Sequence, residues 1–174
     1  MSTSVITRTA SPQETAAISA LNARVFGPGR FTRSAYRVRE GKGVMSRFCR
    51  VADRNGRLIA SLRLTEVSIG GTPGAVLLGP LAVDPEFHGQ GYGRQLVAEA
   101  IEEMTREGIA VVVLVGDEPY YGRFGFKPLP RGTIVFPGPV NPARILAAEL
   151  KPGAIADYRG LIAAASADGT GGKG

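Results

Sequence analysis

The sequence predicts an α/β protein built on a mixed β-sheet, and two patterns carry that prediction. Two strand-like runs, Arg47–Asp53 and Arg57–Val67, are joined by Asn55-Gly56, a pair that favours the tight turn of an antiparallel hairpin. Further on, the apolar run Ala75–Val83 leads through a glycine-rich loop into an amphipathic helical pattern and then into the β-branched run Ile109–Val115. A strand–helix–strand order predicts that these last two strands are parallel. Antiparallel and parallel pairs together give a mixed sheet.

The remaining elements follow from capping and breaking signals. Val5–Arg8 alternates as a short strand does, and Ser11-Pro12-Gln13-Glu14 forms a capping box that starts a helix ending at Gly27-Pro28-Gly29. Residues 30–43 are basic and weakly patterned, so they predict a loop or a short second helix. Alternating residues make Arg57–Val67 a half-buried strand. Thr133–Phe136 is predicted as a last short strand.

The sequence predicts that the C-terminal part, residues 141–165, is helical. Residues 141–165 predict one or two helices broken at Pro152-Gly153, and residues 168–174 predict a flexible tail. We therefore expect a main domain over residues 1–140, a helical extension over 141–167 that packs on it, and the tail.

Composition limits the class of protein. The chain has 174 residues, of which 44% are apolar and 21% charged, as expected for one globular domain. One cysteine and one histidine exclude an internal disulfide and a His/Cys metal cluster, so no metal is expected. Cys49 reads as a small core residue. Residues 1–10 lack a secretory pattern, and Ile109–Val115 is too short to span a bilayer. The sequence predicts a cytoplasmic protein with no membrane partner.

The net charge of +6 is unevenly distributed. Eleven arginine and lysine residues lie between Arg24 and Arg63, against only Glu40 and Asp53. This region is a solvated basic face, or it attracts an acidic substrate, the phosphates of a cofactor or nucleic acid. Nucleic acid is the least favoured of these because no aromatic stacking positions alternate with the arginines.

The most informative stretch is Phe87–Arg94, which holds glycines at positions 89, 91 and 93 at the start of the amphipathic helix. Backbone N–H groups in such a loop can bind an anion together. The first turn of the helix carries Arg94 and no acid, which favours a bound anion there. A dinucleotide fingerprint is a poor match because Leu96 stands where a third glycine is needed, and no Gly-Lys-Ser/Thr of a P-loop follows.

The strand before this loop contains Gly79-Pro80. Proline cannot donate to a sheet ladder, so the strand should be distorted or open on one side there. The backbone groups of Leu81 and Val83 would then be free to bind an extended ligand that carries amides.

Taken together, the Val83–Gly93 string, the helix after it and Tyr121–Phe126 resemble the acyl-CoA-binding core of the GNAT (Gcn5-related) N-acetyltransferases. The longer string from Gly116 to Phe126 is similar to the YhbS-like branch of predicted acetyltransferases. The resemblance implies the GNAT fold, with a central mixed sheet of about six to seven strands flanked by helices, and acetyl-CoA as cosubstrate.

The resemblance also implies roles for particular residues. Leu81, Ala82 and Val83 would lie along the pantetheine. Tyr121 would be the general acid that protonates the departing thiolate. His88 stands where the family usually has Arg or Gln, and the favoured alternative is that its side chain is a solvated loop residue. The pyrophosphate would bind to the loop and first turn, which comprise Gly89, Gln90, Gly91, Tyr92, Gly93 and Arg94.

The general base stays unassigned. Some family members, such as histone acetyltransferases, carry a glutamate on the central strand, whereas this chain has Leu77 there. Glu66 shares the parity of Leu62 and Leu64 and is a candidate to hold a water molecule as base, against the alternative of a solvated carboxylate.

The function predicted is transfer of an acetyl group from acetyl-CoA to a primary amine by direct attack in a ternary complex. The acceptor is a small molecule or a peptide, and the basic region leaves an acidic one open. The alternatives are a non-catalytic CoA-binding regulatory module and, less favoured, a basic nucleic-acid-binding protein. A monomer and a homodimer fit the sequence equally.

Overall fold

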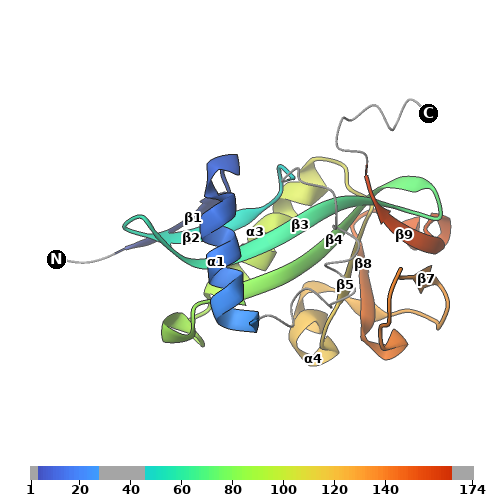
Figure 1. The fold of residues 1–174 in the computed structure, drawn as a ribbon. Coiled ribbons are helices and arrows are strands. Elements are labelled where there is room, and N and C mark those ends of the chain that lie inside the picture. Colours follow the sequence, from blue (N-terminus) through green and yellow to red (C-terminus); the bar gives the residue numbers. More distant parts are fainter. Residues whose placement is uncertain (1–3, 28–45, 166–174) are drawn as a thin grey trace.

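The computed structural model describes residues 4–27 and 46–165, and its centre is one twisted sheet with helices on both faces (Figure 1). The strands run in the order β1-β2-β3-β4-β5-β8-β6, and β9 pairs with both β3 and β7 off that path. The β4–β5 and β7–β9 pairs are parallel and the other pairs antiparallel. The predicted mixed sheet is confirmed, and with nine strands in the described residues it is larger than the resemblance implied.

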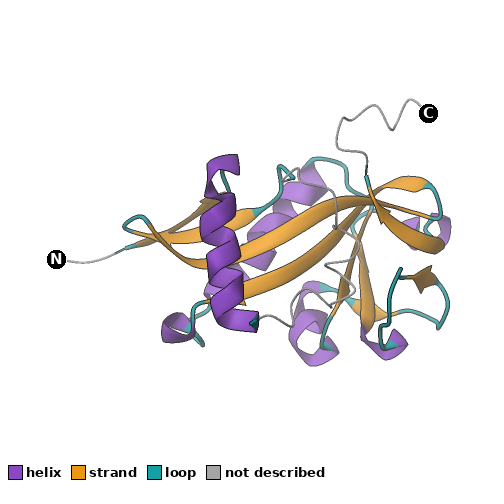
Figure 2. Ribbon diagram, viewed as in Figure 1, coloured by secondary structure: helices purple, strands orange, loops and turns teal. Residues whose placement is uncertain are grey.

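The elements have the following bounds, and Figure 2 colours them by type. The strands are β1 Val5–Thr9, β2 Arg50–Arg54, β3 Arg57–Ile69, β4 Thr72–Val83, β5 Val111–Val115, β6 Lys127–Pro128, β7 Ile134–Val135, β8 Ile145–Glu149 and β9 Gly160–Ala164. The α-helices are α1 Thr15–Phe26, α3 Tyr92–Arg106 and α4 Glu118–Tyr121. Single 3-10 turns are η1 Pro12–Glu14, η3 Pro85–Phe87, η4 Gly122–Phe124, η5 Pro142–Arg144 and η6 Ala154–Asp157.

Two hydrophobic clusters lie on the two faces of the sheet. On one face the apolar side of α3 packs over β2, β3 and β4, in a cluster that includes Leu96 and Val97 of the helix and Leu62 and Leu64 of β3. The opposite face is covered by α1 over β3 and β4 (Figure 1), and farther along by residues of the 134–162 segment. The prediction of a half-buried β3 is therefore wrong in its first half: residues 58–62 are buried because α1 and α3 lie on opposite sides of them.

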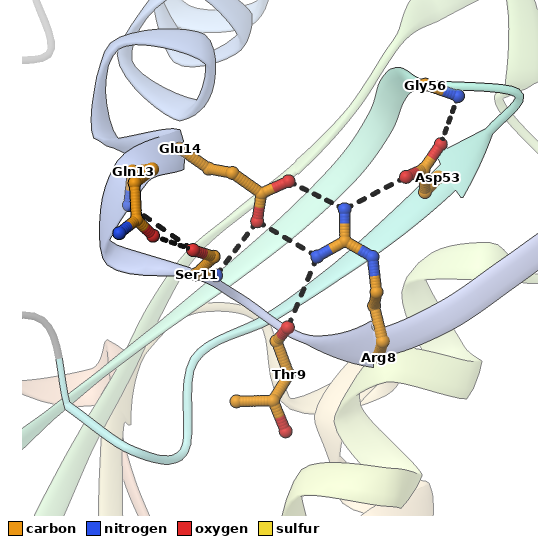
Figure 3. Close-up of polar contacts among 7 residues, drawn as sticks. All are labelled: Arg8, Thr9, Ser11, Gln13, Glu14, Asp53 and Gly56. Carbon is orange, nitrogen blue, oxygen red and sulfur yellow. Dashed lines mark hydrogen bonds and ion pairs between the residues drawn. The ribbon is translucent and has the colours of Figure 1, made fainter.

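Local signals placed the first elements correctly. Asn55 and Gly56 have φ angles of 53° and 88°, as the predicted hairpin turn requires, and they join the antiparallel β2 and β3. The predicted capping box at Ser11 is present: its side chain accepts from Gln13 N–H, and Glu14 accepts from Ser11 N–H at 2.8 Å (Figure 3). The capped turn is η1, and α1 continues it to Phe26.

The helices predicted over residues 141–165 are wrong. The structure has β8 and β9 there, separated by η6. The run Ile145-Leu-Ala-Ala-Glu149 contains good helix formers, but β5 offers it a long antiparallel ladder, from Val111–Glu149 to Val115–Ile145. Tertiary pairing overrides local propensity at this position. The segment after residue 141 is thus part of the sheet and not a helical extension.

Some predictions fall on residues that the structure does not describe. These are the loop or second helix at 30–43 and the tail at 168–174. The short strand predicted at Thr133–Phe136 is confirmed as β7. Within residues 4–27 and 46–165, no helix combines the length and the apolarity needed to cross a membrane.

Candidate functional site

The candidate site begins where β4 and β5 separate. The two strands pair only from Ala75–Val111 to Leu77–Val113. Beyond that point β4 continues to Val83 and pairs with β3 alone. The β3–β4 register shifts between Leu62 and Leu64, opposite Gly79-Pro80, so the predicted distortion is confirmed. The far end of β4 thus has an edge with no paired strand in the described part of the chain.

The alternation of the backbone shows which groups face that gap. Asp84 N–H donates to Ile59 O on β3 at 2.8 Å. Because successive residues of an extended chain present their N–H and C=O groups to opposite sides, Val83 and Leu81 present theirs away from β3. Ala82 faces β3, where it pairs with Ser61. Leu81 and Val83 therefore offer backbone donors and acceptors to whatever occupies the gap.

A glycine-built loop follows this free edge directly. Gly89 and Gly91 adopt left-handed φ angles of 80° and 90°, and Gly91 is the N-cap of α3. No side chain caps α3 at this end. The first N–H groups of a helix have no partner within the helix. A Cβ atom built on Gly89 or Gly91 would meet nothing within 4 Å, so the loop is open on the Cβ side of both glycines. This is the geometry of an anion site.

Gly93 brings this loop against the free edge of β4. A Cβ atom built there would lie 3.3 Å from each of three atoms: Leu81 Cδ2, Val83 Cγ2 and the Tyr120 hydroxyl. A larger residue would require these side chains to shift by a few tenths of an ångström or more. The anion loop and the free strand edge are therefore adjacent, and one ligand with an anionic end and an extended amide chain can contact both.

Two arginines flank the loop. Arg94 is exposed in the first turn of α3. Arg123 donates from Nε to Tyr120 O at 3.0 Å, and its guanidinium lies 5.2 Å from the centre of the Tyr120 ring. Burial raises the pKa of Tyr120 above its usual 10.0, and the charges of Arg123 and Arg94 oppose that shift. Sequence reasoning missed Arg123, although it lies inside the Tyr121–Phe126 motif.

The two tyrosines pack together beside the gap and contact different elements. A Cβ atom on Gly116, just beyond β5, would be 2.8 Å from Tyr121 Cε2, so the Tyr121 ring covers the end of β5. The Tyr120 ring packs edge-on against it, with centroids 4.8 Å apart, and its hydroxyl reaches Gly93 at the start of α3. Tyr120 was not selected from the sequence, because only Tyr121 has the motif spacing.

Asp84 fixes the entry to the loop, and it too was missed. Its side chain is nearly fully buried. Oδ1 accepts from Glu86 N–H at 3.0 Å, while Oδ2 accepts from Arg57 at 2.9 Å and from Arg24 at 3.4 Å. The Glu86 N–H lowers the pKa of Asp84, burial opposes this, and Arg57 adds to the lowering. The carboxylate therefore joins α1, β3 and the loop.

Other predicted site residues lie at the edge of the site or outside it. His88 and Gln90 are exposed in the loop, and the His88 N–H donates to Pro85 O. Glu66 pairs with Val76, in the part of β4 that is still joined to β5. It lies 4.0 Å from Arg47, which also binds Glu107 just past the C-terminal end of α3, the end opposite the loop. The structure does not bring Glu66 to the gap.

A separate hollow of about 360 Å³ lies in the segment from Leu129 to Ile145. Its lining is mostly apolar, with Phe136 and Val140 among the side chains and Arg131 as a charged one. None of the predicted site residues lines it. No group of three or more His, Cys, Asp or Glu side chains within residues 4–27 and 46–165 is placed to hold a metal ion.

Comparison with known proteins shows which class of protein the chain resembles. Residues 46–128 match the family model described as an acetyltransferase (GNAT) domain. The matched stretch runs from just before β2 to β6 and contains the gap, the glycine loop and both tyrosines. This part of the chain is therefore similar to a GNAT acetyltransferase domain, and the resemblance found in the sequence is confirmed.

Particular relatives narrow the comparison. The chain is 40% identical over 76 residues to the uncharacterized N-acetyltransferase YhbS of Escherichia coli K12, and this alignment covers 43% of the chain and 46% of YhbS. The chain thus spans about half the length of the curated relative that it matches. The crystal structure of Escherichia coli YhbS in complex with CoA superposes with a TM-score of 0.78 at 28% identity, covering 94% of this chain and 91% of YhbS.

A more distant structure has the same fold. A GNAT family acetyltransferase from Brucella melitensis, in complex with acetyl-CoA, superposes with a TM-score of 0.71 at 24% identity. It covers 96% of this chain and 99% of its own. The GNAT fold predicted from the sequence is confirmed over nearly the whole chain.

Proposed function

We propose that this protein is an N-acetyltransferase that uses acetyl-CoA to acetylate a primary amine in a ternary complex. The observation that carries the proposal is the continuity of the free β4 edge at Leu81–Val83 with the glycine loop at Gly89–Gly93. An extended amide chain next to a diphosphate is the shape of CoA. The bound CoA of YhbS and acetyl-CoA of the Brucella protein support this choice of ligand.

The residues around the gap fit the parts of this ligand. The amides from Gly89 to Arg94 would hold the pyrophosphate, with Arg94 and Arg123 adding positive charge. Leu81 and Val83 would bond the pantetheine amides as a neighbouring strand does, and Ala82 lies between them on β4. The buried Asp84 would keep the loop in register with β4.

Acetyl-CoA supplies an activated acyl group. In the reaction the amine nitrogen forms a bond to the acyl carbon, the carbon–sulfur bond breaks with its electron pair going to sulfur, and the nitrogen loses a proton. Tyr121 lies at the end of β5, on the rim of the gap, and we assign its hydroxyl as the acid that protonates the sulfur. Tyr120 packs against that ring and is assigned a positioning role.

The proton acceptor for the amine is not assigned to Glu66. The carboxylate lies beside the closed part of the sheet and next to Arg47, on the α3 side. Solvent accepts the proton from the amine in this proposal. The pH profile of kcat/KM reports the titration of the free substrate amine and of the free enzyme. If a group on the enzyme titrates in this profile in addition to the amine, a protein base takes the proton instead.

The test is release of free thiol from acetyl-CoA in the presence of a panel of primary amines, with the N-acetyl product identified by mass spectrometry. We expect amine-dependent thiol release and a mass increase of one acetyl group on the accepted amine. A protein that is stabilised by CoA but acetylates no amine in the panel would be a non-catalytic CoA-binding module, and the proposed activity would be rejected.

A further inference from the structure

Arg63 on β3 is a partly buried charged residue whose surroundings in the described chain do not account for its charge. It is partly buried, yet no carboxylate among the described residues pairs with it. The other partly buried arginines differ: Arg8 and Arg50 each contact a carboxylate. Arg54 lies over the ring of Phe87. Keeping a cation half out of water without a partner is unfavourable, so such a residue points to a missing anion.

The position of Arg63 in the sheet relates it to the gap. Leu62 pairs with Leu81 and Leu64 with Leu78, so Arg63 has no register partner and lies opposite Gly79-Pro80. The β4–β5 ladder ends at Leu77, one residue before Leu78. Arg63 is therefore one strand away from the gap, at the level where the gap opens.

The face of the sheet on which the Arg63 side chain lies follows from its neighbours. Leu62 and Leu64 both pack in the cluster with α3, so alternation puts the Arg63 side chain on the opposite face. On β4, opposite Arg63, a Cβ atom built on Gly79 would meet nothing within 4 Å among the described residues.

Two hydroxyls on the same strand and face share the lack of partners. Ser61 Oγ and Thr65 Oγ1 are buried and make no hydrogen bond. They lie two residues before and two residues after Arg63, about 7 Å away along the strand in each direction. A guanidinium and two hydroxyls can all donate hydrogen bonds, and a carboxylate or phosphate accepts only.

The phosphates of CoA do not account for this set. Val83, the last residue of β4 before the glycine loop, is four residues beyond Gly79, which corresponds to about 13 Å of strand. Arg63 is therefore level with the reactive end of the site and far from the pyrophosphate loop. In the proposed reaction, the molecule that comes to the reactive end beside Arg63 is the acceptor amine.

We infer that the acceptor is a primary amine that also carries an anionic group, a carboxylate or a phosphate, which Arg63 binds with the hydroxyl of either Ser61 or Thr65 as a second donor. The inference rests on the proposed acetyltransferase function and adds the substrate class to it. Anchoring the anion at Arg63 would leave the amine free to reach the gap between β4 and β5.

The experiment uses matched pairs of amines that differ in the anion: phenethylamine with phenylalanine for the carboxylate, and ethanolamine with phosphoethanolamine for the phosphate. For the full chain we expect kcat/KM to favour the anionic member of at least one pair by about tenfold or more. Which pair shows the larger ratio identifies the anion.

Variants then attribute the preference to Arg63. Arg63→Gln should raise KM for the anionic amine about tenfold and leave the neutral amine unchanged, while Arg63→Lys should retain part of the preference. Arg159→Gln removes the same charge from an exposed position and should change nothing. Separately from turnover, the favoured anionic amine should raise the Tm of the CoA-loaded wild type and not of CoA-loaded Arg63→Gln.

Other outcomes would overturn the inference. Acetylation of amines without a preference for the anionic members, or a preference that survives in Arg63→Gln, would reject the anionic acceptor and leave the acetyltransferase proposal standing. If thiol release from acetyl-CoA is the same with and without an amine, the acetyltransferase proposal is rejected, and this inference with it.

Discussion

The β1–β2 edge of the sheet and the β4–β5 gap use their arginines in opposite ways. At the edge, Arg8 binds both Glu14 at 2.6 Å and Asp53 at 2.9 Å (Figure 3). Around the gap, Arg63, Arg94 and Arg123 contact no carboxylate among the described residues. The first arrangement satisfies its charges within the fold and joins β1, η1 and β2. The second leaves positive charge available, which is what an anionic ligand requires.

The largest expected effect separates the two tyrosines at the gap. Tyr121→Phe should lower kcat about 100-fold with little change in the Kd of CoA, because it removes a proton donor that acts only in the reaction. Tyr120→Phe is the matched control and should cost only a few-fold. Unchanged turnover in Tyr121→Phe would remove the acid assignment, and a larger loss in Tyr120→Phe would transfer it to that residue.

The next effect concerns the unpaired arginines. Arg94→Gln and Arg123→Gln should each raise the Kd of CoA about tenfold, the value of one charge-assisted contact. Isothermal titration at two salt concentrations measures this, and the effect should shrink at the higher one. Arg106→Gln, on the same helix but paired with Glu103 at the other end, is the control and should leave the Kd unchanged. If all three variants bind CoA equally well, the two arginines do not contact the phosphates.

The paired edge should respond in stability and not in binding. Arg8→Gln leaves Glu14 and Asp53 close together without their shared cation. Because these side chains are partly exposed, we expect a loss of about 1 to 2 kcal/mol in the free energy of unfolding. In a chain of this size that lowers Tm by about 2 to 8 °C. The Kd of CoA should stay the same, and a weaker Kd would show that the edge and the gap are coupled.

The smallest effect is the pH dependence of the paired carboxylates. Hydrogen bonds from Arg8 lower the pKa of Glu14. For Glu99, burial acts to raise the pKa, but hydrogen bonds from Gln95 and Thr7 and the charge of Arg50 outweigh it and the pKa is lowered. The pKa of Asp84 is lowered from 3.8, chiefly by the Glu86 N–H.

A lowered pKa stabilises the fold fully above the usual value of the group, and this stability is lost as the pH falls through the folded value. Tm should therefore be flat near neutral pH and should fall with acid below about pH 4 to 5. Asp84→Asn keeps the cap to Glu86 and should make this acid limb shallower. A Tm that rises with acid would contradict the assigned directions.

The part of the fold that the sequence predicted well depends on local backbone chemistry. Asn55-Gly56, Gly79-Pro80 and the glycines from 89 to 93 restrict the backbone through their own residue types, wherever the rest of the chain lies. Their positions therefore identified the hairpin, the distorted strand and the glycine loop before α3. The capping box at Ser11 is of the same kind.

The part that it predicted badly depends on tertiary partners. Ile145–Glu149 has helical propensity and became β8 because β5 had an open edge. Asp84 and Tyr120 lie inside the quoted motifs, but their roles depend on contacts with distant residues, Arg57 for Asp84 and Gly93 for Tyr120, which the motifs do not reveal. The parity of Glu66 with Leu62 and Leu64 predicted the face of the sheet on which Glu66 lies. It did not predict that Glu66 lies opposite the part of β4 that is still paired with β5.

Thermal unfolding with CoA tests the central claim, that the free β4 edge and the glycine loop together bind CoA. At a hundredfold excess over its Kd, CoA should stabilise the protein by about 2.7 kcal/mol. This corresponds to a rise in Tm of about 5 to 10 °C. Pantetheine, which lacks the pyrophosphate, should give a much smaller rise at the same concentration. No rise with millimolar CoA, or an equal rise with pantetheine, would contradict the account.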